Sequence, residues 1–518
     1  MPRTNKTAWL LLTAVLLLPL LSMTIVPLYD TSEPRYAEIA RIMAQTGDWI
    51  TPWFSPGVPF WGKPPLSFWA QALSMKAFGY TEFAARFPSW LCLLLSNAII
   101  IAGLRTLQTP RVALLAAIIY STFGLVYVSS GAVLTDPFLA LGTTLSLISF
   151  AMAVHNHTLI AAGTGNQPAQ ASSAFKKWGA LWWQYGFFLG LVIGLLSKGP
   201  LAVVVSFAPI VVWYAFTRKT ATLWAALPWV KGLVLTAALS LPWYILAEIK
   251  TPGFLDYFIV GEHFRRFLDA GWKGDLYGTA HRRPYGEIWL FWLQASFPWG
   301  IALLAGLLGA LRNMRLRSAT KAVGNDPFLC YWLASVLFTP LFFTFSANIL
   351  WTYLLPSLAG LSVIAAIFAD QLSQQVVVSR RNLFGVAAIV PTVVLIFSVV
   401  VWVKPDLRNS ERGLVHYVKQ HDTSEAPLLY LSKPPFSAEF YSAGKVHEIK
   451  KNELKLASEC AAPFYLAIPK KTQMEAAGII GKPLEQLYAN KRYVLVKVTG
   501  DQHNCQLSQQ ATRTVSSR

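Results

Sequence analysis

Long apolar stretches alternate with short polar segments over the first 403 residues of the chain. A helix of about 20 apolar residues is about 30 Å long and can cross the hydrocarbon core of a bilayer. We place such stretches near residues 8–28, 87–104, 112–131, 137–154, 179–197, 200–216, 230–247, 287–310, 327–345, 350–368 and 383–403. The pattern predicts a mostly α-helical, polytopic membrane domain over residues 1–403, with about eleven transmembrane helices.

The first stretch raises an alternative, because Arg3 and Lys6 precede its apolar run as in a secretory signal peptide. The run is too long for a signal peptide and has no small-residue cleavage site. We therefore keep residues 8–28 as a transmembrane helix.

The pattern changes after Trp402, where the chain becomes polar. Residues 409–420 have a helical pattern. Short strand candidates lie at residues 426–432, 463–469 and 492–498. Residues 404–500 are thus predicted to form a small α/β domain, and residues 501–518 are predicted to be disordered.

Basic residues in short loops indicate which span ends face the cytoplasm, because such loops are enriched in Lys and Arg. They recur at every second turn: Arg105, Arg111, Lys176, Lys177, Arg218, Lys219, Arg312 to Lys321, Arg380 and Arg381. We expect the N-terminus to be cytoplasmic and the long loops 29–86 and 248–286 to lie outside the cytoplasm. An odd number of spans would also place the C-terminal domain outside.

Composition narrows the class of protein and its partners. Of the 518 residues, 54% are hydrophobic and 13% are charged, which excludes an ordinary soluble domain. The net charge of +19 could suggest nucleic acid, but the basic residues are scattered through membrane loops and the tail. Anionic lipid headgroups and phosphates are the expected partners instead.

The four cysteines divide between two environments. Cys92 and Cys330 lie in apolar spans and are expected to serve only in packing. Cys460 and Cys505 lie in the exported tail and could form a disulfide in an oxidising compartment.

Asp136 is the only acidic residue between Glu82 and Glu248, and it ends an apolar stretch in the string AVLTDPF. An ionisable group at the poorly hydrated end of a span is costly, so a function is the first hypothesis. Because Pro137 follows, the carboxylate could instead cap the next helix. A cap and a catalytic role are compatible.

The first outer loop concentrates ionisable groups directly after the first span. They are Asp30, Glu33, Arg35, Tyr36, Glu38 and Lys63. The helical spacing of Glu33, Ala37 and Arg41 also fits an amphipathic helix resting on the bilayer. Lys63, before two prolines, could be a snorkelling lysine. The density of charges nevertheless favours a polar site.

Later segments add further candidates. Lys198 interrupts an apolar stretch in LLSKGPL, which indicates a broken helix facing a cavity or a tight hairpin with a snorkelling lysine. In the second outer loop, His263 could be an acid/base group or a solvated histidine, and Arg266 suits a pair of phosphate oxygens. Tyr353 could donate to a phosphate or lie in an interfacial aromatic belt.

Several strings together resemble the bacterial lipid A aminoarabinose transferases. In chain order they are EPRYAEIA (33–40), GDW (47–49), GKPP (62–65), AVLTDPF (132–138), SKGP (197–200), EHFRRF (262–267) and LWTYLLP (350–356). The wider match is to the polyprenyl-phosphate-dependent glycosyltransferases of the GT-C class, which include the protein mannosyltransferases. The resemblance covers most of residues 8–370 in order.

The resemblance implies a GT-C enzyme that moves a sugar from undecaprenyl phosphate, or a similar polyprenyl phosphate, to lipid A of lipopolysaccharide or another exported acceptor. The reaction would take place at the periplasmic face of the bacterial inner membrane. In this family Asp136 and an acid of the first loop, Glu33 or Asp30, would act at the reacting centre. The residues implied or proposed to bind the substrate and its phosphate are Arg35, Tyr36, Lys63, Lys198, His263, Arg266 and Tyr353.

The chain departs from the aminoarabinose transferases at three places. Ser32 and Glu33 stand where those enzymes have Asp-Glu, and Gly62 stands where they have Glu before Lys-Pro. The family's larger members also carry two further spans before the exported tail, which the hydropathy pattern of this chain does not show. The sugar could therefore differ.

The chemistry is consistent with these residue types, because Lys and Arg would neutralise a phosphate leaving the anomeric carbon. We favour direct displacement with inversion, with Asp136 or Glu33 as general base if the acceptor is a hydroxyl. The two carboxylates could instead hold a divalent cation, although no ligand motif is evident. The alternatives are a protein O-mannosyltransferase and, ranked lower, a lipid or sugar transporter, which would carry charges near span centres.

Overall fold

The computed structural model describes residues 3–162, 173–279, 281–375, 380–422, 426–460, 462–481 and 483–499. The chain divides into two compact units. The first comprises Met1–Met23 and Met43–Ile396, and the second comprises Thr24–Ile42 and Phe397–Arg518. The predicted Cys460–Cys505 disulfide and the predicted disorder of residues 501–518 lie outside the described residues and side chains.

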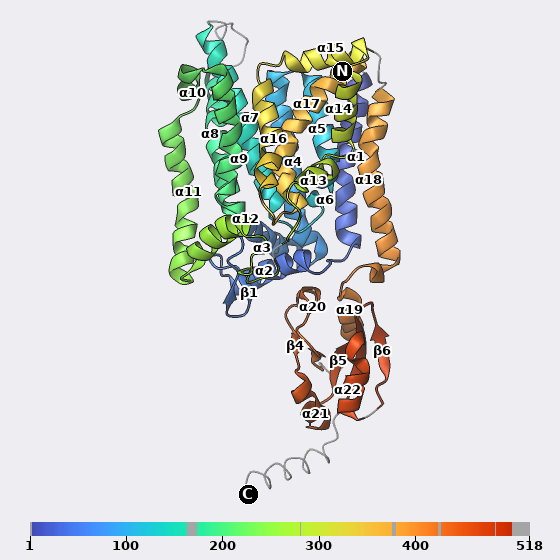
Figure 1. Ribbon diagram of the computed structural model, residues 1–518. Coiled ribbons are helices and arrows are strands. Elements are labelled where there is room, and N and C mark those ends of the chain that lie inside the picture. The colour runs from blue at the N-terminus through green and yellow to red at the C-terminus, as the bar shows by residue number, and fades with distance from the viewer. Residues whose placement is uncertain are drawn as a thin grey trace. The chain divides into compact units, whose positions relative to one another are not determined.

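The first unit is a bundle of helices (Figure 1). Its helices are α1 (Arg3–Ile25), α3 (Leu66–Phe78), α4 (Glu82–Leu107), α5 (Pro110–Thr122), α6 (Gly124–Ser130), α7 (Asp136–Ala161), α8 (Ser173–Lys198), α9 (Leu201–Thr217), α10 (Thr220–Ala226), α11 (Trp229–Lys250), η2 (Asp256–Arg265), α12 (Arg266–Leu268), α13 (Ile288–Ala295), α14 (Trp299–Gly309), α15 (Met314–Gly324), α16 (Leu329–Thr344), η3 (Trp351–Leu354), α17 (Leu355–Gln374) and α18 (Arg380–Val403). A short hairpin of β1 (Trp53–Ser55) and β2 (Val58–Pro59) precedes α3.

Each apolar stretch predicted from the sequence is helical, and the chain is a multi-pass membrane protein. The count of eleven spans is not confirmed. Within the described residues, seven helices are long and apolar enough to cross a membrane, or up to ten if three bent pairs each form one span. The bends are 70° between α5 and α6, 99° between α13 and α14, and 95° between α15 and α16. The described cysteines Cys92 and Cys330 are free.

Small residues bring α7 and α8 into close contact at the centre of the bundle. A Cβ atom on Gly142 would lie 2.6 Å from the carbonyl oxygen of Gly190. The Ser146 hydroxyl donates to the Phe187 carbonyl oxygen at 2.8 Å. Such small-residue interfaces let membrane helices approach closely. The pairing places the first residue of α7, Asp136, beside the last residue of α8, Lys198.

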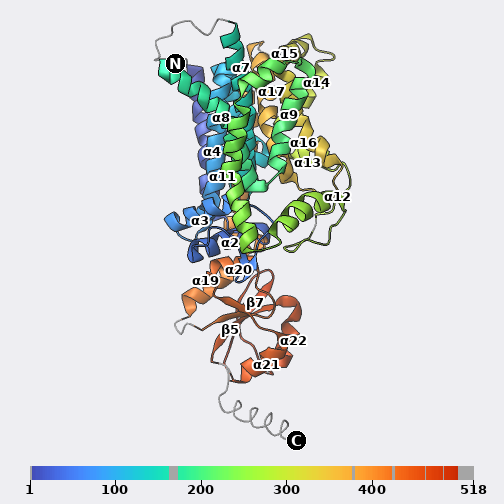
Figure 2. The ribbon, with the colours of Figure 1, turned by 90° about the vertical axis from the view of Figure 1, so that its left-hand side faces the viewer.

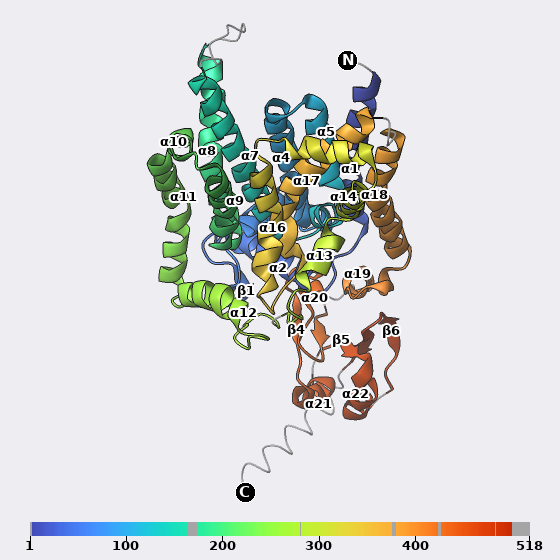
Figure 3. The ribbon, with the colours of Figure 1, turned by 45° about the horizontal axis from the view of Figure 1, so that its top comes forward.

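The two ends of the first unit differ in character. α10 and the basic, amphipathic α15 lie at one end, whereas α3 and α12 lie at the other (Figures 1 and 2). α8 and α11 form one flank of the bundle, and α1 and α18 form the opposite flank (Figure 3). The short basic loops next to α10 and α15 therefore share an end, as the sequence pattern predicts, and the second outer loop lies at the opposite end.

The second unit contains a five-stranded sheet of order β4-β3-β5-β7-β6. Its elements are α19 (Arg412–His421), β3 (Leu428–Tyr430), α20 (Phe436–Tyr441), β4 (Val446–Glu448), α21 (Lys451–Cys460), β5 (Phe464–Pro469), α22 (Gln473–Ile480), β6 (Gln486–Ala489) and β7 (Tyr493–Val498). β3 pairs in parallel with β4 and β5, and β7 pairs antiparallel with β5 and β6. The three predicted strands and the predicted helix are present.

This unit also includes residues 24–42, which contain the start of the first outer loop and most of α2 (Ser32–Thr46). The Leu28 amide donates to the Tyr441 hydroxyl at 2.8 Å, and the Asp30 amide donates to the Asn409 carbonyl oxygen at 3.0 Å. The sequence pattern did not suggest this association.

Candidate active site

A cavity of about 280 Å³ lies at the end of the first unit that contains the second outer loop. Its polar lining includes Lys63, Lys198, Glu262, His263, Arg266, Ser346, Asn348 and Tyr353. Its apolar lining consists of Pro200, Leu201, Val204, Phe258, Phe264, Phe267, Phe342 and Phe343. A cavity lined both by clustered cations and by aliphatic and aromatic groups fits an amphiphilic anion.

Asp136 reaches the cavity through Lys198. Its carboxylate forms a buried ion pair with the Lys198 ammonium group, and each side chain is only 9% exposed. Thr135, not Asp136, is the N-cap residue of α7, and it makes no side-chain cap hydrogen bond. The capping alternative for Asp136 is therefore wrong, and Lys198 is paired within the protein rather than snorkelling.

The turn after Lys198 fixes the direction of its side chain. Gly199 has a φ of +75°, and a Cβ atom there would lie 2.7 Å from the Phe258 ring, so only glycine fits without displacing that ring. The Lys198 ammonium group lies 4.5 Å from the centre of the Tyr353 ring, close enough for a cation–π contact. Segments far apart in the chain thus converge at Lys198.

His263 holds this turn against the second outer loop. Its Nδ1 lies 2.8 Å from the Phe258 carbonyl oxygen and its Nε2 lies 3.1 Å from the Lys198 carbonyl oxygen. Burial lowers the pKa of His263, so the ring is neutral at pH 7 and donates its single N–H to one of the two oxygens. This geometry makes His263 a positioning residue for the Lys198 turn.

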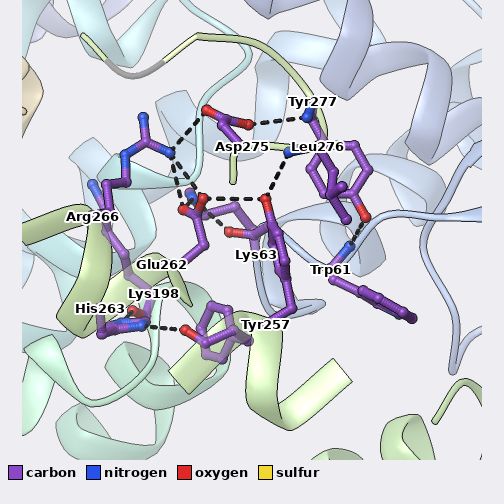
Figure 4. Close-up of polar contacts among 12 residues, drawn as sticks. Trp61, Lys63, Lys198, Tyr257, Glu262, His263, Arg266, Asp275, Leu276 and Tyr277 are labelled. Atoms are coloured by element: carbon purple, nitrogen blue, oxygen red, sulfur yellow. Dashed lines mark hydrogen bonds and ion pairs between the residues drawn. The ribbon is translucent and has the colours of Figure 1, made fainter. Parts of the chain in front are cut away.

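Glu262 joins the two remaining cations of the cavity (Figure 4). Its carboxylate lies 3.2 Å from the Lys63 ammonium group and 2.9 Å from Nη1 of Arg266. Arg266 also contacts Asp275 at 3.3 Å. Burial alone would raise the pKa of Glu262, but the charges of Lys63 and Arg266 outweigh burial and lower it, so the group is ionised.

Glu262 was not singled out from the sequence. The available signal was its position four residues before Arg266 in EHFRRF, which places the two side chains on one helical face. Its second partner, Lys63, is 199 residues away and could not be read from that pattern. Lys63 is therefore held by a carboxylate and is not a free snorkelling lysine.

The structure brings together one group of the predicted site residues. They are Lys63, Lys198, His263, Arg266 and Tyr353, all of which line the cavity, and Asp136, which is bound to Lys198. The roles predicted for the first-loop residues Asp30, Glu33, Arg35 and Tyr36 stay predictions, because these residues belong to the second unit.

Within the second unit, Asp30 is fully engaged by other groups. One carboxylate oxygen accepts from the Ser437 amide at 2.9 Å. The other accepts from the Ser437 hydroxyl at 2.6 Å and from Nη2 of Arg492 at 2.5 Å. These bonds attach the first-loop segment to the rest of the second unit, the sheet unit, and leave Asp30 little capacity to bind a substrate.

The donor set does not fit a metal ion. Among the residues that the structure describes, no group of three or more His, Cys, Asp or Glu side chains is placed to hold one. The carboxylates of Asp136 and Glu262 are each bound by cationic side chains.

Comparisons with known proteins agree with this architecture. The model of the dolichyl-phosphate-mannose-protein mannosyltransferase family matches residues 6–258. The undecaprenyl phosphate-alpha-4-amino-4-deoxy-L-arabinose arabinosyl transferase of Aeromonas hydrophila subsp. hydrophila is 29% identical over 404 residues, which cover 76% of this chain and 66% of that protein. The protein of the same name from Edwardsiella ictaluri is 32% identical over 351 residues, which cover 67% of this chain and 56% of that protein.

The chain thus spans less than two thirds of the length of these relatives.

Among solved structures, the chain is similar to the crystal structure of ArnT from Cupriavidus metallidurans bound to undecaprenyl phosphate. The TM-score is 0.73 at 17% identity, and the match covers 96% of this chain and 100% of that one. The same protein in the apo state has a TM-score of 0.71 at 18% identity, with the same coverage. The shared fold extends over nearly the whole chain.

Proposed function

The chain is a GT-C-type membrane protein similar to the undecaprenyl phosphate-aminoarabinose transferases, and from this premise we propose that it is a polyprenyl-phosphate-dependent glycosyltransferase. It moves a sugar from undecaprenyl phosphate, or a similar lipid phosphate, to lipid A or a related exported glycolipid. The observation that carries the proposal is the cavity lined by three cations, Lys63, Lys198 and Arg266, together with an apolar wall of aliphatic and aromatic groups. The cations suit the phosphate and the wall suits the polyprenyl chain.

The reaction breaks the bond between the anomeric carbon and a phosphate oxygen, and the bonding electrons stay with that oxygen. An acceptor oxygen forms the new bond from the opposite face, which inverts the anomeric configuration. The Lys63, Lys198 and Arg266 side chains would stabilise the charge that develops on the leaving phosphate, because preorganised cations line the cavity that would hold it. Tyr353 lines the same cavity and would donate its hydroxyl to a phosphate oxygen.

Asp136 is the proposed general base when the acceptor is a hydroxyl, and it would pass the acceptor proton out of the site. An acceptor phosphate would need no base. Glu33 is the preferred first-loop carboxylate, because both oxygens of Asp30 are already bound by Ser437 and Arg492. Arg35 and Tyr36 remain candidate partners of the donor.

We place the protein in the bacterial inner membrane with the N-terminus in the cytoplasm and the sheet unit in the periplasm. Support comes from the basic segments beside α10 and α15, which share one end of the first unit (Figure 1). The cavity lies at the other end, on the side where an exported acceptor would be available.

Protein O-mannosylation is the second candidate, because the mannosyltransferase family model matches residues 6–258. The cavity explains donor binding equally well for either acceptor, so acceptor identity separates the two. A transporter is disfavoured, since the clustered charges line a cavity at the span ends.

The test is mass spectrometry of lipid A from cells with and without the gene, combined with transfer by the purified protein from undecaprenyl phosphate-linked sugars. The proposal predicts a glycosylated form of lipid A that disappears with the gene. Unchanged lipid A together with gene-dependent glycopeptides would favour protein O-mannosylation. No gene-dependent glycosylation of either acceptor would contradict the enzyme.

A further inference from the structure

Glu262 is an ionised carboxylate placed inside the group of cations that line the cavity. Its side chain is 6% exposed and bridges Lys63 at 3.2 Å and Arg266 at 2.9 Å. A carboxylate in this position lowers the positive potential of the cavity, because it neutralises part of the charge that an anionic ligand would meet. A site evolved only for the tightest possible anion binding would not contain it.

The charge of the lipid changes during the proposed reaction. The donor is a phosphodiester with one negative charge, whereas the product is a phosphomonoester with a charge of about −1.5 to −2 at pH 7. Lys63 and Arg266 without the Glu262 carboxylate between them would therefore bind the product more tightly than the donor. The enzyme would then be inhibited by its own product, because tight product binding slows each turnover.

Arg266 shows that the cavity retains binding capacity despite Glu262. Its Nη1 is bonded to Glu262 and Asp275, but its Nε is buried without a hydrogen-bond partner. Because the Arg266 side chain is also 13% exposed and lines the cavity, a lipid phosphate can approach it without displacing Glu262. The carboxylate would remain beside the phosphate throughout the reaction.

We propose that Glu262 is a resident counter-anion that weakens the binding of the polyprenyl phosphate product and so allows its release. This inference rests on the proposed glycosyltransferase function. A purely structural role, in which Glu262 only holds Lys63 and Arg266 in place, makes the opposite prediction. Loss of its charge would then loosen the cations and weaken lipid phosphate binding.

The test is Glu262→Gln, which keeps the size of the side chain and an acceptor oxygen but removes the charge. We expect the Kd for undecaprenyl phosphate to fall about tenfold, because one negative charge close to the bound phosphate is lost. In steady-state transfer, kcat and the KM for the donor should both fall, as expected for slower product release. An unchanged or raised Kd in the folded variant would overturn the inference.

Asp275→Asn provides a second variant in case Glu262→Gln does not fold. Asp275 contacts Arg266 at 3.3 Å, and it does not line the cavity. Loss of its charge should lower the Kd for undecaprenyl phosphate by a smaller factor, about two- to threefold. If Glu262→Gln does not fold, unchanged or weaker binding by Asp275→Asn would overturn the inference.

The wild-type measurement separates this inference from the function on which it rests. If the wild-type protein binds undecaprenyl phosphate and the variants bind it no more tightly, only the role of Glu262 fails. If the wild-type protein does not bind undecaprenyl phosphate, the proposed function fails and the inference fails with it.

Discussion

Each compact unit contains a cluster in which one arginine contacts two carboxylates, but only the cluster of the first, helical unit lines a cavity. In the sheet unit, Arg492 bonds to Asp30 at 2.5 Å and to Glu411 at 2.8 Å. Ser437 and Asn490 occupy the remaining carboxylate oxygens. In the helical unit, Arg266 also contacts two carboxylates, but its Nε has no partner and its side chain lines a cavity.

This difference distinguishes charged residues that stabilise the fold from charged residues that can bind a ligand. A buried ion cluster whose donors and acceptors are all satisfied has little left to offer a ligand, and it ties distant segments together. A cluster whose cationic side chains line a cavity can still be reached by an anion. We call the group of Arg492, Asp30 and Glu411 in the second unit the closed cluster. We call the cavity cations Lys63, Lys198 and Arg266 in the first unit, with their carboxylate partners, the open cluster. The two clusters should therefore respond differently to mutation.

The largest expected effect is in the open cluster. Asp136→Asn should reduce glycosyl transfer by about a thousandfold or more while leaving membrane insertion intact, because the proposed base and the counter-ion of Lys198 are both lost. The measurement is sugar transfer by the purified variant. Asp370→Asn is the matched control, since Asp370 pairs with Arg111 at the far end of α17. Retained activity in Asp136→Asn would remove Asp136 from the mechanism.

In the closed cluster, stability should change instead. Arg492→Met leaves Asp30 and Glu411 buried without their cation, so the free energy of unfolding of the sheet unit should fall by about 3 kcal/mol. Hydrogen exchange of the β5 and β7 amides measures this loss. Lys451→Met, which removes an exposed pair with Glu475, should have almost no effect. Equal exchange rates in the two variants would mean that the closed cluster is not structural.

A smaller effect is expected for Lys63→Ala. The KM for the lipid donor should rise about tenfold, because a charged hydrogen bond to phosphate is lost. Donor titration in the transfer assay measures this change. Lys250→Ala is the control, since Lys250 pairs with Asp48 and does not line the cavity. An unchanged donor KM in Lys63→Ala would count against its phosphate role.

The smallest effect concerns the pH dependence of the sheet unit. Burial and the nearby carboxylate of Glu38 raise the pKa of Glu439 from 4.5 to about 7, against the opposing charges of Lys433 and Arg41. The folded state therefore binds this proton more tightly than the unfolded state. Stability from this group is present below pH 4.5 and is lost as the pH rises to about 7.

Glu439→Gln should remove this pH dependence and stabilise the unit by about 1 kcal/mol at pH 8, allowing for solvent near this half-buried side chain. Thermal unfolding between pH 5 and pH 8 gives the comparison. If the variant and wild type lose stability in parallel over this range, another group is responsible.

The sequence was sufficient for the features that depend on local pattern. The predicted apolar stretches coincide with the long apolar helices of the bundle but not with shorter ones such as α3, α10 and α15. An isolated ion in an apolar context identified Asp136 and Lys198. Bent helices were not predictable, because hydropathy does not encode a change of direction at Phe123 or between α13 and α14. Contacts between segments that lie far apart in the chain could not be predicted from the sequence either.

Two such contacts changed the interpretation of particular residues. Asp30 looked catalytic beside the other first-loop charges, yet its partners Ser437 and Arg492 lie more than 400 residues away. Glu262 looked like one of many loop charges until Lys63 was found beside it. In both cases the partner, rather than the residue type, indicates whether a charge serves structure or binding.

The most direct test of the open cluster is a structure of this protein with undecaprenyl phosphate bound in a lipid nanodisc. The account predicts the phosphate within about 4 Å of the charged groups of Lys63, Lys198 and Arg266, with the polyprenyl chain along Leu201, Val204 and the phenylalanines of the cavity. A phosphate bound away from these three cations, with the cavity left to another ligand, would contradict it.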